Sequence, residues 1–515
     1  TVFVIKKFLD GSIEKGTSQI MIGVAKKSGY MPRKQMYAQI ITSSLTVGMG
    51  GSAGLESPIT ITGAAFGSNF AQNFRFNYKD RTLLLACGVA SGIAAAFNAP
   101  IAGVLFAIEV IIADMSVTAF IPLMISSATG AIVSAVVLKE SIILNFKSQF
   151  TFDYSNIGYY VLVGIAAGFF SIYHARMFRK VEHFASNLPF GTYRKALIGA
   201  SMLAVLIFLF PTLFGEGYES IKSLANNNAA DILENSLLEK FRKNPWIVLV
   251  FVGLTAFIKS IATGLTLGSG GNGGNFAPSL FVGSYLGYMV AKFIELIGLK
   301  KLPIENFTVV GMAAVLSGLF HAPLTAIFLI AEITGGYGLM VPLLIVSSIS
   351  FAISKRYDNY SMDIFTIADK GLVFTSDKDK NILNKIELHN IYSNDAEVLT
   401  TEHSMHDVKN LFLTTNQTFI PIINEERNVL GIIYLNDVRS IFFNNYKLNT
   451  TFIETEIKPA FSVSLSENTG NALQLMDENH LSEILVTQQN KLIGYVTKVK
   501  ILEVYRENLK NLRIE

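Results

Sequence analysis

Two glycine-rich breaks in an apolar chain hold residue types that could bind an anion. The first, GGSAGLESP, covers residues 50–58, and the second, GSGGNGGNFAP, covers residues 268–278. In each break glycines precede a proline, Pro58 or Pro278, that suits the first turn of a helix. Backbone N–H groups exposed there, together with the positive end of the helix dipole, bind anions without a cationic side chain. Glycines also serve turns and close helix packing, but two clusters in matching positions favour the anion site.

The first break contains a single carboxylate, Glu56, two residues before Pro58. An ionised carboxylate deep in an apolar domain needs a partner or a function, because its burial is costly. At a helix N-terminus it can occupy the place of an anion, swing aside when an anion competes, or leave when it is protonated. The alternative is a capping acid at a solvated helix end.

Other polar residues of the apolar part fit structural roles. Glu109 and Glu332 each close an apolar run that starts with Ala-Pro, and we interpret both as braces that accept hydrogen bonds. His321 is interpreted as a joint at a helix break, and Lys259 as a residue that lines a vestibule or reaches an interface. The sequence contains no phosphate-binding loop or His-Glu-x-x-His motif, so we predict neither an enzyme nor a metal site. The single cysteine, Cys87, excludes an intrachain disulfide framework.

The composition predicts a membrane domain followed by a soluble tail. Half of the 515 residues are hydrophobic and only 16% are charged, and the mean hydropathy is +0.42. Apolar segments fill residues 1 to 355, whereas the sequence from residue 372 onward has the composition of an ordinary soluble protein. Several apolar segments are shorter than the roughly 20 residues of a full span or are cut by Gly and Pro, which is typical of the broken helices of transporters. The formal charge of +3 gives no reason to expect nucleic acid as a partner.

Two pairs of elements indicate an internal duplication. GIAAAFNAPIAGVLFAIEV, residues 92–110, and AVLSGLFHAPLTAIFLIAEIT, residues 314–334, share small residues, a Phe, a polar residue, Ala-Pro and a closing Glu. The members of this pair lie about 220 residues apart, as do the two glycine-rich breaks. We therefore predict two structural repeats that bring their helix ends to a common site.

These motifs resemble the CLC family of chloride channels and chloride/proton antiporters. The family's Gly-[Lys/Arg]-Glu-Gly-Pro element, which carries the gating glutamate, reads GLESP at residues 54–58, and its Gly-x-Phe-x-Pro element reads GNFAP at residues 274–278. The resemblance implies a homodimer in the lipid bilayer, with one anion pathway per subunit and two inverted repeats of broken, tilted helices. With Glu56 as the gate, it also implies a chloride site close to the backbone of Gly54, Leu55, Asn275 and Phe276.

Three positions depart from the family pattern. The family's first anion motif, Gly-Ser-Gly-Ile-Pro, falls where this chain has only Gly16, Thr17 and Ser18, and either hydroxyl could face the anion. The antiporters' second, proton-carrying glutamate falls on Val110, which cannot relay a proton and favours passive conduction. The central anion-contacting tyrosine falls on Asp363, which would repel an anion unless it is protonated or turned away.

The tail contains two similar units, each with the order strand, helix, strand, turn, strand, helix. They resemble a tandem pair of CBS domains, which can bind adenine nucleotides. Asp437 in the first unit fits the ribose-binding acid and Thr497 in the second fits the hydroxyl residue, but each unit lacks the other half of the motif. We therefore favour a dimerisation and gating module without a cofactor over a nucleotide site.

Together these patterns predict an α-helical, multi-pass protein of the plasma (inner) membrane with a cytoplasmic α/β tail. We place the CLC-type domain, without the family's earliest helices, at residues 1–371, a linker at 372–391, and the CBS domains at 392–448 and 449–515. The predicted function is passive, channel-like chloride conduction gated by Glu56. The alternatives are a chloride/proton antiporter with an unusual proton route, a fluoride-selective exchanger, and a membrane-anchored nucleotide sensor whose anion pathway is inactive.

Overall fold

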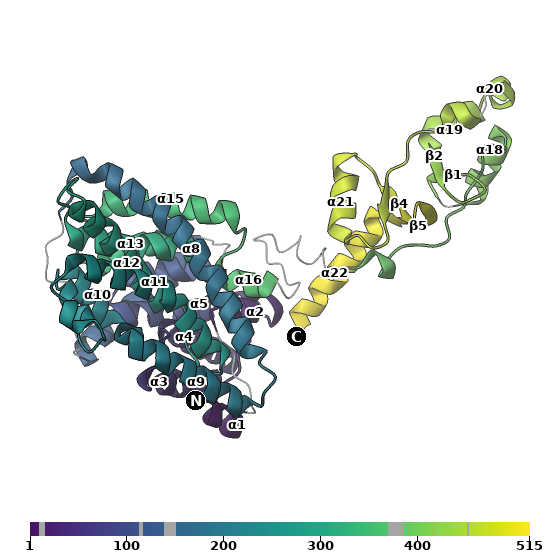
Figure 1. Ribbon diagram of the computed structural model, residues 1–515. Helices are drawn as coiled ribbons and strands as arrows, with labels where there is room; N and C mark the ends of the chain where they lie inside the picture. The colour runs from purple at the N-terminus through teal and green to yellow at the C-terminus, as the bar shows by residue number, and fades with distance from the viewer. Residues whose placement is uncertain are drawn as a thin grey trace. The chain divides into compact units, whose positions relative to one another are not determined.

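The computed structural model describes residues 1–9, 16–112, 117–138, 151–368, 383, 386–415, 417–450 and 453–514. The chain forms two compact units, Thr1–Leu372 and Val373–Glu515. The first is helical and the second contains both helices and strands (Figure 1). Most of the predicted linker, residues 372–382 and 384–385, lies outside the described residues.

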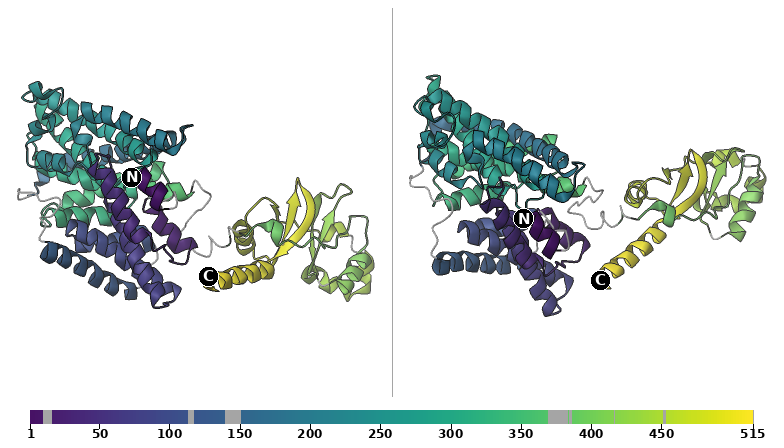
Figure 2. Two further views of the ribbon diagram at one scale, coloured as in Figure 1. Left: turned by 90° about the horizontal axis from the view of Figure 1, so that it is seen from below. Right: turned by 60° about the horizontal axis from the view of Figure 1, so that its bottom comes forward.

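The first unit is built from helices of very unequal length (Figures 1 and 2). A π-helical turn, Ala107–Ile112, extends α6, and a second one, Ser134–Leu138, extends α7. The helices are α1 Val2–Phe8, α2 Ser18–Lys26, α3 Gln35–Gly48, α4 Glu56–Asn73, α5 Tyr78–Phe97, α6 Pro100–Phe106, α7 Val117–Val133, α8 Ile157–Ser186, α9 Thr192–Leu209, α10 Tyr218–Ala225, α11 Pro245–Gly268, α12 Phe276–Leu296, α13 Ile304–Phe320, α14 Pro323–Ile333, α15 Met340–Tyr357 and α16 Met362–Ala368.

Full-length and short apolar helices occur side by side, as the interrupted pattern predicts. Among the described residues five helical stretches are long and apolar enough to cross a membrane: 78–97, 119–137, 154–186, 192–209 and 245–268. Three further apolar helices, 100–111, 304–320 and 323–333, are shorter than a full span. Broken helices are stable at membrane depth only where protein or a water-filled path satisfies their free backbone groups.

The helix breaks follow from local sequence. Asn98 and His321 end α5 and α13 in the left-handed conformation, with φ of 51° and 55°, and the following Ala-Pro starts the next helix. The apolar stretch 323–353 divides into α14 and α15 at Thr-Gly-Gly-Tyr-Gly-Leu, where Gly335 has a φ of +75°. Left-handed backbone is accessible to Gly and, less readily, to Asn and His, so these residues set the boundaries.

The predicted repeats appear as two matching helix pairs. In the pair α4 and α5, a Cβ at Gly63 would lie 2.1 Å from the carbonyl oxygen of Gly88. In the pair α12 and α13, a Cβ at Gly283 would lie 2.4 Å from the carbonyl oxygen of Gly311. Any larger residue would force the paired backbones apart, so equivalent glycines let both pairs pack closely.

The two glutamates that close the Ala-Pro elements cap each other's repeat. Glu332 accepts hydrogen bonds from the backbone N–H of Ile101 (2.9 Å) and Ala102 (2.8 Å) in the first turn of α6. Glu109 accepts them from the backbone N–H of Leu324 (3.1 Å) and Thr325 (2.8 Å) in the first turn of α14. The structure therefore confirms the bracing role predicted for both acids, because each satisfies free N–H groups of the opposite repeat.

The second unit contains two small sheets. One pairs β1 with β2 in antiparallel register, and a single parallel bridge joins Leu399 to Ile422 in β1. The other has the order β3-β4-β5, with β3 parallel and β5 antiparallel to β4. The elements are α18 Met405–Thr414, β1 Phe419–Ile423, β2 Val429–Tyr434, α19 Leu435–Phe442, α20 Asn445–Thr450, β3 Ser462–Ser464, α21 Thr469–Glu478, β4 Glu483–Gln488, β5 Lys491–Thr497 and α22 Lys498–Ile514.

The second half of this unit has the element order predicted for it. In the first half the initial strand is reduced to the bridge at Leu399, and the remaining elements follow the prediction. The two halves share an apolar cluster formed by Phe419, Ile423 and Ile432 with Leu485 and Leu492. The tail is therefore one folded unit made of two related halves.

Candidate anion-transport site

The two glycine-rich breaks meet and hydrogen-bond to each other. The N–H of Gly54 donates to the carbonyl of Gly274 (2.9 Å), and the N–H of Gly274 donates to the carbonyl of Gly54 (2.8 Å). A Cβ at Gly54 would lie 2.2 Å from Oε2 of Glu56, and one at Gly274 would lie 2.2 Å from Oγ of Ser57. Glycine is therefore required at both positions, and the bridge fixes the N-termini of α4 and α12 beside one another.

Glu56 is the first residue of α4, and its side chain is buried with 3% exposure. The hydroxyl of Tyr218, the first residue of α10, donates a hydrogen bond to Oε1 of Glu56. The backbone N–H of Ala277, in the first turn of α12, donates to Oε2 over 3.3 Å. The carboxylate therefore lies at the N-terminus of the opposite repeat's helix, in contact with an N–H group that an anion could bind.

The third helix start at this place belongs to α2. Gly16 has a φ of +78°, Thr17 is the N-cap of α2 and Ser18 is its first residue. Thr17 is buried and its Oγ1 lies 3.3 Å from Oγ of Ser57. The carboxyl group of Asp363, in the first turn of α16, interacts with the side chain of Thr17. The structure thus brings Thr17 and Asp363 together beside α4.

The residues that precede α4 and α12 occupy equivalent positions. Leu55 is the N-cap of α4 and Asn275 is the N-cap of α12. Phe276 is buried, and its ring packs near those of Phe97 (5.7 Å between centroids) and Phe320 (5.7 Å). This aromatic packing holds the N-terminus of α12 in place, so its N–H groups are pre-arranged for a ligand.

Val110 lies in the π-helical turn Ala107–Ile112 and is 8% exposed. Its neighbour Glu109 is occupied with the N-terminus of α14. A valine side chain neither binds nor releases a proton, so this position supplies no proton relay.

Sequence reasoning missed Glu216 and Tyr218, and its interpretation of Lys259 as a residue that reaches an interface is wrong, because the side chain is completely buried. Lys259 is fully buried on α11, donates from Nζ to the carbonyl of Gly215 (3.1 Å) and lies 4.7 Å from the ring centre of Phe281. Its charge interacts with the carboxylate of Glu216. The signal available in the sequence was Gly-Glu-Gly-Tyr at residues 215–218, an acid between two glycines directly after an apolar run.

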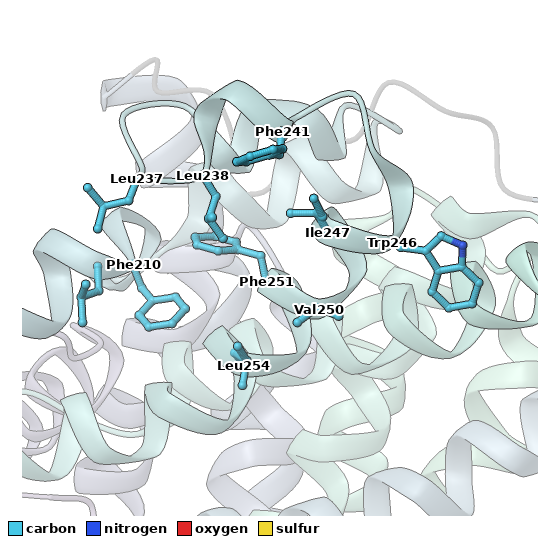
Figure 3. Close-up of a pocket in the computed structure, with 10 residues that line it drawn as sticks. Phe210, Leu237, Leu238, Phe241, Trp246, Ile247, Val250, Phe251 and Leu254 are labelled. Carbon is cyan, nitrogen blue, oxygen red and sulfur yellow. The ribbon is translucent and has the colours of Figure 1, made fainter.

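An apolar groove of about 580 Å³ lies apart from these residues, beside α11. Figure 3 shows Phe210 and Leu237 at one end of the groove and Trp246 at the other. An anion site needs hydrogen-bond donors or positive charge, and this lining is apolar. The groove is therefore not part of the anion site. It is lined by Leu209, Phe210, Leu237, Leu238, Phe241, Trp246, Ile247, Val250, Phe251 and Leu254.

In the tail, the two residues considered for nucleotide binding have protein partners. The carboxylate of Asp437 forms an ion pair with Lys458 (2.8 Å). The hydroxyl of Thr497 accepts a hydrogen bond from the backbone N–H of Lys500 (3.2 Å). Within the described part of the chain no group of His, Cys, Asp or Glu side chains could hold a metal ion.

Comparisons with known proteins follow the same division of the chain. The family described as voltage gated chloride channel matches residues 1–355, and the CBS domain matches residues 388–444 and 455–507. The chain is 28% identical over 322 residues to the voltage-gated ClC-type chloride channel ClcB of Escherichia coli, which covers 61% of this chain and 71% of that protein.

Two further matches are to exchangers. The H(+)/Cl(-) exchange transporter ClcA of Vibrio cholerae is 30% identical over 311 residues, which cover 58% of this chain and 62%, less than two thirds, of ClcA. A crystal structure of a slow cyanobacterial Cl-/H+ antiporter matches 72% of this chain and 84% of that chain, with a TM-score of 0.59 and 22% identity. The last match shows a common fold.

Proposed function

Because the chain belongs to the voltage gated chloride channel (CLC) family, we propose that this anion transporter conducts chloride passively under the control of Glu56. The protein is a multi-pass membrane protein and not an enzyme. The observation that carries the proposal is the contact of the Glu56 carboxylate with the N–H of Ala277. There the protein's own carboxylate takes a hydrogen bond that a permeating anion would use.

The gating step follows from competition at the N-terminus of α12. Ionised Glu56 accepts from Ala277 and Tyr218 and thereby excludes an anion from this N–H group. Protonation removes the charge that the helix end stabilises, and the side chain can then leave. Chloride then takes its place at the N-terminus of α12, near Asn275 and Phe276, beside the hydroxyl of Thr17 or Ser18. The N–H of Gly54 is bonded to Gly274 and that of Leu55 lies against Glu216, so these two residues border the site without donating to the anion.

Passive conduction is supported by Val110. Antiporters of this family usually carry a second, proton-carrying glutamate, and here the residue at that position is a buried valine. The matches include a channel, ClcB, and an exchanger, ClcA, at similar identity, so the chemistry of Val110 decides our choice.

Simultaneous chloride and proton fluxes from purified protein in liposomes test this proposal. We expect chloride efflux without proton movement against a pH gradient. A proton flux in fixed proportion to a chloride gradient would refute the passive mechanism and leave an antiporter with another proton route. Glu56→Gln mimics the protonated gate, so its chloride flux is expected to lose its pH dependence, and Glu234→Gln, an exposed acid, serves as the matched control.

The altered first anion motif favours one second candidate. Thr17 lies where the family has its Gly-Ser-Gly-Ile-Pro element, and Asp363 lies where the family has its anion-contacting tyrosine. The two residues interact, and each differs from the family pattern at a position that contacts the anion, so both bear on which anion is selected. A fluoride-selective exchanger would release fluoride far faster than chloride from the same liposomes.

We further propose that the protein is a homodimer in the plasma (inner) membrane, with the CBS pair in the cytoplasm. The CBS pair acts in assembly and gating. Adenine nucleotide binding at Asp437 and Thr497 is the alternative role for the tail.

A further inference from the structure

A short glycine-flanked turn covers the start of α4. Gly215 and Gly217 have φ values of +64° and +91°, which few other residues adopt. A Cβ at Gly217 would lie 2.5 Å from the ring of Phe281 on α12, so the turn is packed tightly against that helix. On its other side, Nζ of Lys259 on α11 donates to the carbonyl of Gly215 over 3.1 Å. The position of residue 216 is therefore fixed from both sides.

This turn brings a second acid to the N-terminus that carries Glu56. The half-buried carboxylate of Glu216 lies against the backbone N–H of Leu55, the N-cap of α4. Two residues later, the hydroxyl of Tyr218 donates to Glu56 itself. The charges of Glu216 and Glu56 interact, so two acids lie at the N-terminus of α4.

Among the described residues, other charged and titratable groups around Glu216 come from α8, α10, α11 and α12. On α11, Lys259 opposes its charge, and on α10, Tyr218 links it to Glu56. The face of α12 contributes Phe281 and the hydroxyl of Tyr285, which lies near Ser220 and Thr212. On α8, the buried His174 lies behind Lys259, where its Nδ1 is 2.8 Å from Oγ of Ser260.

We infer that Glu216 is a positioning acid that sets the proton occupancy of Glu56, with Lys259 as the opposing charge. This inference rests on the proposed gating role of Glu56. When two carboxylates at one helix start are both ionised they repel each other, which favours the protonated form of one of them. A cation beside one carboxylate, as Lys259 is beside Glu216, reduces this repulsion. The pair therefore titrates as a unit, and the half-buried Glu216 is the member closer to solvent.

The test is the pH dependence of chloride efflux from liposomes holding the full-length protein, measured from pH 4 to pH 8. In Glu216→Gln the negative charge beside Glu56 is lost, so Glu56 ionises more easily and the midpoint moves to lower pH by about 1 unit. In Lys259→Met the compensating positive charge is lost, so the midpoint moves to higher pH. The double variant is expected to lie between the two single variants.

Matched controls separate charge from structure. Glu219→Gln makes the same chemical change at an exposed position on α10 and is expected to leave the midpoint unchanged. Glu216→Asp keeps the charge and is expected to retain the wild-type midpoint even where packing loss lowers the amount of folded protein. Thermal unfolding of each purified variant reports that amount independently.

The outcomes distinguish this inference from the proposed function. A midpoint for Glu216→Gln equal to that of Glu219→Gln, or shifts of the same sign for Glu216→Gln and Lys259→Met, would overturn it. If Glu56→Gln nevertheless abolishes the pH dependence, the gating role of Glu56 stands without Glu216. Absence of anion flux from the wild-type protein at every pH would remove the proposed function itself.

Discussion

Replacement of Glu109 by Gln is expected to destabilise the membrane unit without affecting the gate. The Glu109 carboxylate accepts from the N–H of Leu324 (3.1 Å), the N–H of Thr325 (2.8 Å) and the hydroxyl of Thr325 (2.7 Å). Glutamine keeps one acceptor oxygen, but its NH₂ group then faces either the N–H of Leu324 or the N–H of Thr325, which are donors themselves. Hydrogen bonds to charged groups contribute about 1.5–3 kcal/mol each, so the loss is about 2–4 kcal/mol.

Thermal unfolding of purified protein measures this loss. For a unit that ends at Leu372, about 1 kcal/mol corresponds to a shift of roughly 1.3 °C, so a fall in Tm of roughly 3–5 °C is expected. Glu332→Gln should behave alike, because Glu332 caps α6 as Glu109 caps α14. Glu234→Gln, at an exposed position, is expected to change stability by less than about 0.5 kcal/mol.

The reasoning fails if Glu109→Gln unfolds at the wild-type temperature. It also fails if the variant is stable but shifts the pH midpoint of chloride flux, because Glu109 would then act on the gate. A difference in Tm between Glu109→Gln and Glu332→Gln is expected to be small and to reflect the Thr325 hydroxyl, which only Glu109 binds.

Three further outcomes are expected. Gly274→Ala places a Cβ 2.2 Å from Oγ of Ser57, so chloride flux should fall several-fold in liposomes, whereas Gly336→Ala, which meets nothing within 4 Å, should leave it unchanged. Burial raises the pKa of the Glu483 carboxyl above 4.5. Ionising this group therefore lowers the stability of the tail as pH rises, and Glu483→Gln removes that penalty. The variant should slow hydrogen exchange in the tail at pH 7, where Glu483 is ionised, but not at pH 4, where it is protonated. The exposed Asp437–Lys458 pair contributes about 1 kcal/mol or less, so Lys458→Met should leave the exchange of β2 nearly unchanged.

The parts of the fold that were predictable from sequence depend on local chemistry. Helix starts at Glu56 and Phe276 follow from Gly and Pro spacing, and the repeats follow from two strings about 220 residues apart. The division of the apolar stretch 323–353 into α14 and α15 was not predicted, although its cause is local: Gly335 takes up a left-handed backbone after α14. The bracing role of Glu109 and Glu332 follows from their equivalent positions in the two repeats, whereas the N–H groups that they accept from do not follow from the sequence.

The missed residues depend on distant contacts. Glu216 lies in a polar turn that reads as a surface loop, and its approach to Leu55 joins positions about 160 residues apart that no periodicity links. Helix α10 is amphipathic but only 8 residues long, which is too short to be distinguished from that loop by periodicity. The interaction of Asp363 with Thr17 likewise arises only when α16 packs against α2.

The bridge between Gly54 and Gly274 has a consequence for kinetics. Two backbone hydrogen bonds join the two repeats beside the Glu56 carboxylate. A rigid-body rotation of one repeat against the other would have to break both bonds in each transport cycle. Rotation of a single side chain avoids this barrier, and rotamer changes are far faster than rigid-body domain motion. Opening is therefore expected to have a low activation enthalpy, so transport should depend only weakly on temperature.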